Sequence, residues 1–166
     1  MIEIPFTKLH GAENDFLLTW GDEAPQQNGS DIARRICART TGIGADGWML
    51  VWLQDGHLHT RLFNPDGSEA EISGNGTRCA AAFGLINRVV SPPNISIATG
   101  ALSGNQPFWI RFEYRVEESE SSKDPPDNSG FTLTGLIDIF SRRTRPEQVH
   151  GFEEAGPLRL ENLKRG

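Results

Sequence analysis

The residues best suited to chemistry lie in the segment from Asn64 to Cys79, which reads NPDGSEAEISGNGTRC. Within it, Ser73-Gly74-Asn75-Gly76 leads directly into an apolar run that favours a helix. A helix beginning here offers unpaired backbone N–H groups and the positive end of its dipole, and flanking glycines let a ligand approach the backbone closely. We therefore expect the Gly74 and Asn75 amides to form a carboxylate cradle. Ser73, at its mouth, would be the reacting side chain.

Three motifs together resemble a known family. They are KLHGAENDF (Lys8–Phe16), TTGIGADG (Thr40–Gly47) and the segment above. In order and spacing, over residues 4–100, they resemble the amino-terminal half of diaminopimelate epimerase. The resemblance implies that substrate is bound by Asn14, Asn64, Gly74 and Asn75. It also implies that Ser73 is the catalytic position, although the family carries its first catalytic cysteine there.

The resemblance further implies a function. The family epimerises LL-diaminopimelate to the meso form without a cofactor, in lysine and peptidoglycan precursor synthesis. Two cysteines, one from each half of the family's chain, straddle the α-carbon of this small amino-acid substrate. This chain has no cysteine after Cys79, and its second half does not resemble the family's. We therefore expect an epimerase that is truncated or degenerate here. The alternative is a non-catalytic protein that binds amino acids or carboxylates, or acts in assembly, and retains the cradle.

Serine at position 73 weakens the chemistry. A cysteine thiol has a pKa of about 8.5, whereas a hydroxyl is close to water at roughly 15–16. That gap corresponds to about 10 kcal/mol against forming the basic anion. A helix dipole contributes roughly 0.3–2 kcal/mol. Ser73 would therefore need a neighbouring base, and the nearby sequence offers Glu69 and Glu71.

The same residues also allow plainer interpretations. Ser73-Gly74-Asn75-Gly76 would serve an ordinary tight turn into a helix, and both Asn14 and Asn64 suit local turns. Gly42–Gly47 lacks the lysine of a phosphate loop and is better read as a turn into a strand. Cys79 falls on the apolar side of the helix and is better read as a buried thiol than as a catalytic one.

Composition excludes several classes of function. The 166 residues carry a formal net charge of −6, without a basic stripe, which argues against nucleic acid as a partner. No apolar run is long enough to span a membrane, and no signal peptide is evident, so we expect a cytoplasmic protein. The two cysteines are expected to be free thiols. The four histidines do not cluster with other ligands, so no metal site is expected; a homodimer is one possible assembly.

The pattern of elements predicts an α+β fold. Residues 1–116 should form one lobe, in which a mixed, mostly antiparallel sheet surrounds a helix. A second helix is expected over Ile32–Arg39, capped by Ser30 or Asp31. The expected strands are Phe6–Leu9, Phe16–Trp20, Gly47–Leu53, His57–Phe63, Asn94–Thr99 and Phe108–Val116.

The central helix is expected over Thr77–Val90, and the two histidines at positions 57 and 59 should be exposed on their strand. One face of this helix should be buried through an apolar stripe of Cys79, Ala82, Phe83, Ile86 and Val90. Residues 117–166 are expected to be a loosely ordered tail, because Glu117–Gly130 is polar and contains prolines.

Overall fold

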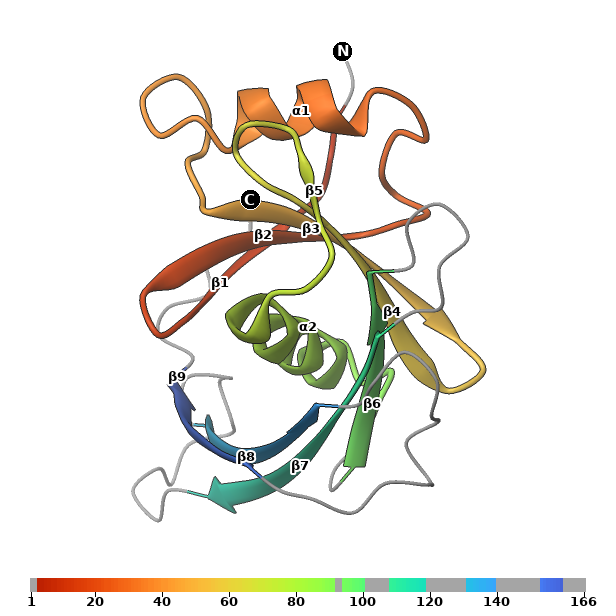
Figure 1. Ribbon diagram of the computed structural model, residues 1–166, viewed down its shortest axis with the longest axis vertical. Helices are drawn as coiled ribbons and strands as arrows, with labels where there is room; N and C mark the ends of the chain where they lie inside the picture. The colour runs from red at the N-terminus through yellow and green to blue at the C-terminus, as the bar shows by residue number, and fades with distance from the viewer. Residues whose placement is uncertain (1–2, 92–93, 101–107, 119–130, 140–152, 160–166) are drawn as a thin grey trace.

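The computed structural model describes residues 3–91, 94–100, 108–118, 131–139 and 153–159 (Figure 1). Two helices and nine strands lie in these ranges. In chain order they are β1 (Thr7–Gly11), β2 (Asn14–Trp20), α1 (Gly29–Ile36), β3 (Gly47–Gln54), β4 (His57–Phe63), β5 (Glu69–Ala70), α2 (Gly74–Ile86), β6 (Asn94–Thr99), β7 (Phe108–Glu118), β8 (Phe131–Ile139) and β9 (Glu153–Arg159).

All nine described strands belong to one sheet, in the order β1-β2-β3-β4-β6-β7-β8-β9, with β5 paired to β4. Two of the pairs are parallel, β2 with β3 and β4 with β6. The other pairs are antiparallel. The predicted α+β class, with a mixed and mostly antiparallel sheet around a helix, is confirmed.

Short turns set the register of the first strands. Ala12 and Glu13 have φ angles of 49° and 68°, so β1 and β2 are joined by a two-residue turn with left-handed backbone. The HGAEND segment, expected to be a loop between strands, is therefore a tight hairpin that pairs His10 with Asp15. Asp55 and Gly56 form the corresponding turn between β3 and β4, as their Asp-Gly sequence predicts.

Helix α2 lies inside the curve of the sheet, which wraps around it from β1 to β9 (Figure 1). Residues 79–84 are all buried, so the helix is covered on most sides and the prediction of one buried stripe is wrong. Small side chains on these positions let strands approach from several directions. Phe83 packs on Trp20 with ring centroids 4.6 Å apart, whereas Ile86 is half-buried.

The bounds of α2 also differ from the prediction of Thr77–Val90. The helix begins at Gly74, because the Ser73 side chain caps it by accepting a hydrogen bond from the Gly76 N–H. It ends at Ile86, where the Asn87 side chain donates to the Phe83 carbonyl. Arg88 then adopts a left-handed backbone with φ of 58°, which the helix cannot continue through.

Helix α1 covers the opposite face of β3 and β4 from α2 (Figure 1). It spans Gly29–Ile36 rather than the predicted Ile32–Arg39, and Asn28 is its N-cap residue. Neither Ser30 nor Asp31 is the cap; Asp31 lies in the first turn and pairs with Arg34 at 2.6 Å. A second apolar core forms beneath this helix around Trp48, whose indole N–H donates to the Thr19 hydroxyl at 3.0 Å.

Beyond residue 100 the sheet continues. Strand β7 crosses residue 116 and pairs with β8, and β8 pairs with β9, so these three strands extend the sheet. The sequence did not predict β8 or β9. Residues 119–130, 140–152 and 160–166 of the predicted tail lie outside the described residues, and the domain boundary at residue 116 stays a prediction. Neither helix of the described ranges has the length and apolar character needed to cross a membrane.

Candidate functional site

The N-terminus of α2 is organised around Ser73. This residue has an extended backbone, with φ −142° and ψ 114°, and its Oγ accepts from the Gly76 N–H at 3.1 Å. The first helical hydrogen bond runs from the Thr77 N–H to the Ser73 carbonyl at 2.8 Å. Helix geometry leaves the Gly74 and Asn75 amides without a partner inside the helix. These are the two N–H groups from which the sequence predicts a carboxylate cradle, and that role stays a prediction.

The two glycines around Asn75 have different surroundings. A Cβ atom added to Gly74 would meet nothing within 4 Å, so open space lies beside this residue. A Cβ atom added to Gly76 would lie 2.8 Å from Met49 Cε and 3.1 Å from Ser73 Oγ. Gly74 is therefore the glycine that leaves room for a ligand. Gly76 instead lets the helix pack closely against β3 and keep its cap.

Two of the predicted binding residues meet directly. Asn75 Nδ2 donates to Asn14 Oδ1 at 2.7 Å, although the residues are 61 positions apart in sequence. Asn14 is the first residue of β2, and Asn75 lies in the first turn of α2. The start of the strand and the start of the helix are thus joined by one hydrogen bond beside the cradle.

Asn64 lies in a turn and forms its hydrogen bonds within that turn. Its backbone N–H donates to the Ser68 carbonyl at 2.8 Å, and its Nδ2 donates to Ser68 Oγ at 2.9 Å. The register of the sheet places Asn64 next to Phe63, which pairs with Trp48 at the start of β3. Asn64 therefore lies at the end of the sheet where β2 and β3 begin. Its role toward a substrate stays a prediction, and the described contacts account for it as a turn residue.

A cluster of charged residues, which the sequence did not predict, lies beside Asn14. Arg39 donates to Asp15 and to Asp46 at 2.7 Å each, and Lys8 pairs with Asp15 at 3.0 Å. Asn14 Nδ2 donates to Asp46 Oδ2 at 3.2 Å. We call Lys8, Asp15, Arg39 and Asp46 the ion cluster. The sequence does place Asp15 and Asp46 within two of the family-like motifs, which could have marked them as residues near the site. Their pairing with Arg39, however, depends on the fold.

Opposing effects act on Asp15. Burial by itself would raise the pKa of this carboxyl group. Hydrogen bonds and charges from Arg39 and Lys8 outweigh burial and hold the pKa well below its usual range. The same pairing raises the pKa of the Arg39 guanidinium. Asp15 and Arg39 are therefore both charged at neutral pH.

Both cysteines are free thiols, as predicted; both are buried, although burial was predicted for Cys79 alone. Burial raises the pKa of Cys79 to about 12, and burial followed by the charges of Asp15 and Asp46 raises that of Cys37 to about 11. Cys79 lies on the buried body of α2, and Cys37 follows α1 on the other side of the sheet. Neither thiol is placed to act as an acid or base at the cradle.

The prediction that the two strand histidines are exposed is wrong. His57 and His59 are both half-buried, and each makes an edge contact with Trp109 of β7, at centroid distances of 5.3 Å and 5.9 Å. Burial, followed by the charge of His57, lowers the pKa of His59. The pairing of β4 and β6, and of β6 and β7, brings these strands together. Within the described ranges, no three His, Cys, Asp or Glu side chains are grouped so that they could hold a metal ion.

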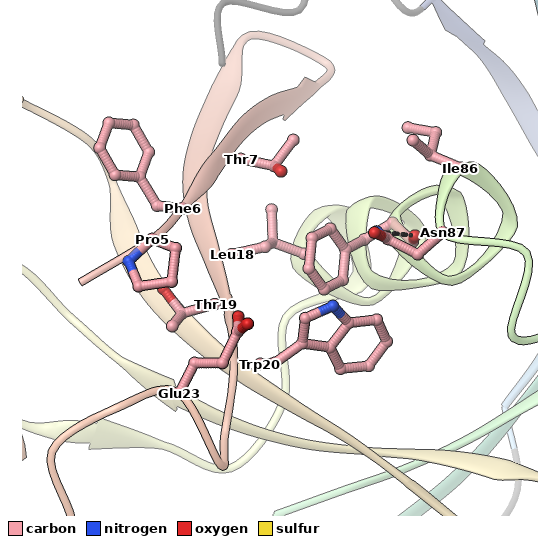
Figure 2. A pocket seen from close by; sticks show the side chains of 10 residues that line it. Pro5, Phe6, Thr7, Leu18, Thr19, Trp20, Glu23, Ile86 and Asn87 are labelled. Carbon is pink, nitrogen blue, oxygen red and sulfur yellow. Dashed lines mark hydrogen bonds between the residues drawn. The ribbon is translucent and has the colours of Figure 1, made fainter. Parts of the chain in front are cut away.

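Two cavities bounded by described residues lie away from the cradle. One of about 310 Å³ is at the C-terminal end of α2, where Figure 2 shows Trp20, Leu18 and Glu23 around it and Asn87 at the helix end. Helix α2 has thirteen residues and is about 20 Å long, so this cavity is far from Ser73. The other, of about 330 Å³, lies on the α1 side and is lined by Trp52, Arg61 and the start of α1. A cleft at the cradle itself stays a prediction.

The arrangement of strands around α2 occurs in a known isomerase structure. The crystal structure of methylitaconate-delta-isomerase matches 81% of this chain and 41% of that chain, with a TM-score of 0.59 and 13% sequence identity. At this level of identity the likeness concerns the fold. The chain therefore shares its fold with part of that isomerase.

Sequence comparison identifies the family. The profile of diaminopimelate epimerase matches residues 6–105, and the chain belongs to this family. Relatives named diaminopimelate epimerase are 36% identical in Methanothrix thermoacetophila and 40% identical in Methanocella arvoryzae, each over 92% of this chain and 54% of the relative. The relative from Moorella thermoacetica is 48% identical over 75% of this chain and 48% of its own length. The chain thus spans about half the length of the curated relatives that it matches.

Proposed function

We propose that this chain provides one half of a cofactor-independent epimerase site for diaminopimelate. The observation that carries the proposal is that Gly74 and Asn75 are the first two residues of helix α2, with open space beside Gly74. Helix geometry leaves the N–H groups at these positions without a partner inside the helix. Such a site binds a carboxylate through two hydrogen bonds and the helix dipole. Family membership supplies the substrate, an α-amino acid whose α-carbon would lie beside Ser73. We further propose that the chain acts in the cytoplasm, in the synthesis of lysine and of peptidoglycan precursors.

Epimerisation sets demands that the two halves of such a site would share. One group removes the α-proton from one face, another returns a proton to the other face, and donors at the carboxylate stabilise the developing negative charge. In this chain, the Gly74 and Asn75 amides would take the last role. Ser73 would face the α-carbon, with Asn14 and Asn64 contacting the remainder of the substrate.

Ser73 is poorly suited to removing the proton. Its hydroxyl has a pKa about 7 units above that of a thiol, and the helix dipole offsets only a small part of the difference. Its Oγ already accepts the cap hydrogen bond from Gly76, which leaves the hydroxyl with one proton to donate and one lone pair to accept. Both cysteines are buried, so neither replaces it. We therefore propose that the chain by itself epimerises diaminopimelate very slowly.

The capping role of Ser73 also favours a second candidate function. A serine that caps α2 maintains the cradle without reacting, which is what a non-catalytic amino-acid-binding or assembly protein needs. In that case the cradle would bind diaminopimelate or another amino-acid carboxylate without exchange of the α-proton.

A combined exchange and binding experiment tests both candidates. Solvent deuterium incorporation at the α-carbon and stereochemical inversion are measured on LL-diaminopimelate, for the native chain, for Ser73→Cys and for Ser73→Ala as the control without an ionisable group. We expect binding by all three chains, and measurable one-sided exchange for Ser73→Cys alone. Rapid inversion by the native chain would contradict the argument from the serine pKa. Binding without exchange even in Ser73→Cys favours the binding protein, and absence of binding contradicts both candidates.

A further inference from the structure

A continuous series of hydrogen bonds links the cradle to the ion cluster. Asn75 Nδ2 donates to Asn14 Oδ1 at 2.7 Å, and Asn14 Nδ2 donates to Asp46 Oδ2 at 3.2 Å. Asp46 Oδ1 in turn accepts from Arg39 at 2.7 Å. The series joins the first turn of α2, the start of β2 and the loop before β3.

The charge of Asp46 sets the orientation of both carboxamides. An ionised carboxylate only accepts hydrogen bonds, so the end of the Asn14 side chain that faces Asp46 must be its NH₂ group. The oxygen of Asn14 then faces Asn75, which in turn must present its own NH₂ group. One carboxylate thus determines the direction of two amide groups, the second of which belongs to the cradle residue Asn75.

Asp46 is itself held from several directions. Its Oδ2 accepts from the Asp15 N–H at 3.1 Å, and its own N–H donates to the Asp15 carbonyl at 2.8 Å and to Asp15 Oδ1 at 3.0 Å. Arg39 bridges the two carboxylates. Lys8 donates to the Gly44 carbonyl at 2.5 Å and pairs with Asp15, which ties the loop before β3 to β1. Because its partners come from separate segments, Asp46 has little freedom to turn away from Asn14.

The orientation matters because asparagine near a helix N-terminus readily bonds to the backbone. Its side-chain oxygen can accept from nearby N–H groups, in competition with any ligand that uses them. The bond from Asn75 to Asn14 draws the Asn75 carboxamide toward β2. The Gly74 and Asn75 amides are then left available to a carboxylate.

We infer that Asp46, anchored by Arg39, is a positioning residue that holds the carboxamides of Asn14 and Asn75 so that the cradle amides stay open. The inference rests on the proposed function for its effect on ligand binding. Its structural part, the fixed orientation of the two carboxamides, applies to the chain without ligand.

The experiment compares Asp46→Asn with a matched control. Asp31→Asn also removes the charge of an aspartate paired with an arginine, but Asp31 lies on α1 away from the cradle. Side-chain amide resonances of Asn14 and Asn75, and the hydrogen exchange of these NH₂ groups, are recorded in the ligand-free chain. Affinity for LL-diaminopimelate is then measured by calorimetric titration, and urea unfolding shows that each variant is folded.

In Asp46→Asn we expect shifted resonances and faster NH₂ exchange for both asparagines, with affinity reduced roughly tenfold, the effect of losing one hydrogen bond to a charged group. Asp31→Asn should match the native chain in both measurements. Native resonances and exchange in Asp46→Asn would overturn the inference, as would shifted resonances with native affinity. If the native chain does not bind diaminopimelate, the proposed function fails, and the ligand-free spectra still decide the positioning role. If Asp46→Asn does not fold, Arg39→Met leaves Asp46 in place and should produce the same spectral changes to a smaller extent.

Discussion

Replacing Ser73 with alanine and with aspartate separates its role as a helix cap from its place beside a ligand. The hydroxyl accepts from the Gly76 N–H at 3.1 Å and is the N-cap of α2, the helix at the centre of the core. Alanine removes this acceptor and adds no charge. Aspartate keeps an acceptor and adds a negative charge at the mouth of the cradle. Alanine should therefore lower stability and leave ligand binding nearly unchanged, whereas aspartate should maintain stability and weaken ligand binding.

The magnitudes follow from the cap and the charge. Loss of an N-cap serine costs about 1 kcal/mol, which lowers the unfolding midpoint by roughly 2–4 °C in a chain of this size. Aspartate caps about as well as serine, and its charge at the helix N-terminus adds about 0.3–1 kcal/mol of stability. A bound carboxylate would be repelled by about 1–4 kcal/mol at a distance of 4 Å, which weakens binding roughly fivefold or more.

Urea unfolding and calorimetric titration with LL-diaminopimelate measure the two effects on the same samples. We expect Ser73→Ala to be less stable with affinity close to native, and Ser73→Asp to be at least as stable with much weaker binding. Unchanged stability of Ser73→Ala would refute the capping argument. Native affinity of Ser73→Asp would show that the substrate carboxylate does not lie at the Gly74 and Asn75 amides.

Three further expectations concern the core, the pH dependence and the thiols. Phe83→Ala should lower the free energy of unfolding in urea by roughly 3–5 kcal/mol, because the ring is buried against Trp20. Ile86→Ala should lower it by less, because that side chain is half-buried. Equal losses would contradict this packing. Because the pKa of Asp15 is lower in the folded state, the folded state binds fewer protons in acid than the unfolded state does. The stability that Asp15 contributes is therefore present above the unfolded pKa of about 3.9 and is lost as the pH falls below it. Asp15→Asn should make the free energy of unfolding less dependent on acidic pH, and an unchanged dependence would refute this assignment. With pKa values raised to about 11 and about 12 by burial, Cys37 and Cys79 should resist a thiol reagent at neutral pH until urea unfolds the chain, and fast labelling of the folded chain would contradict their burial.

Local patterns in the sequence determined most strands of the first hundred residues. The predicted strand Gly47–Leu53 differs from β3 by one residue, and His57–Phe63 and Asn94–Thr99 coincide with β4 and β6. Alternating apolar residues and an Asp-Gly turn specify such strands through contacts a few residues apart. The existence of α2 and the position of its cradle were predictable for the same reason. Resemblance to one family, rather than periodicity, indicated which asparagines are candidates for the site.

The environment of α2 could not be predicted from its own residues. An apolar stripe predicts one neighbour, but the helix lies inside a sheet whose strands come from residues 7 to 159 and is covered on most sides. How far a sheet curls around a helix depends on the order and twist of all its strands, which no local pattern records. Strands β8 and β9, on the far part of that curve, were missed in the same way.

At the candidate site, the sequence by itself determined which residue types are present and where the helix can begin. Ser73, Gly74 and Asn75 are adjacent in the chain, so capping and the open amides follow from local backbone geometry. Only the tertiary structure decided that Asn75 meets Asn14 across 61 positions and that Asp46 orients Asn14 across 32. The physical reason is that the direction of a carboxamide depends on the charge and donors that surround it in space, and the fold determines those neighbours.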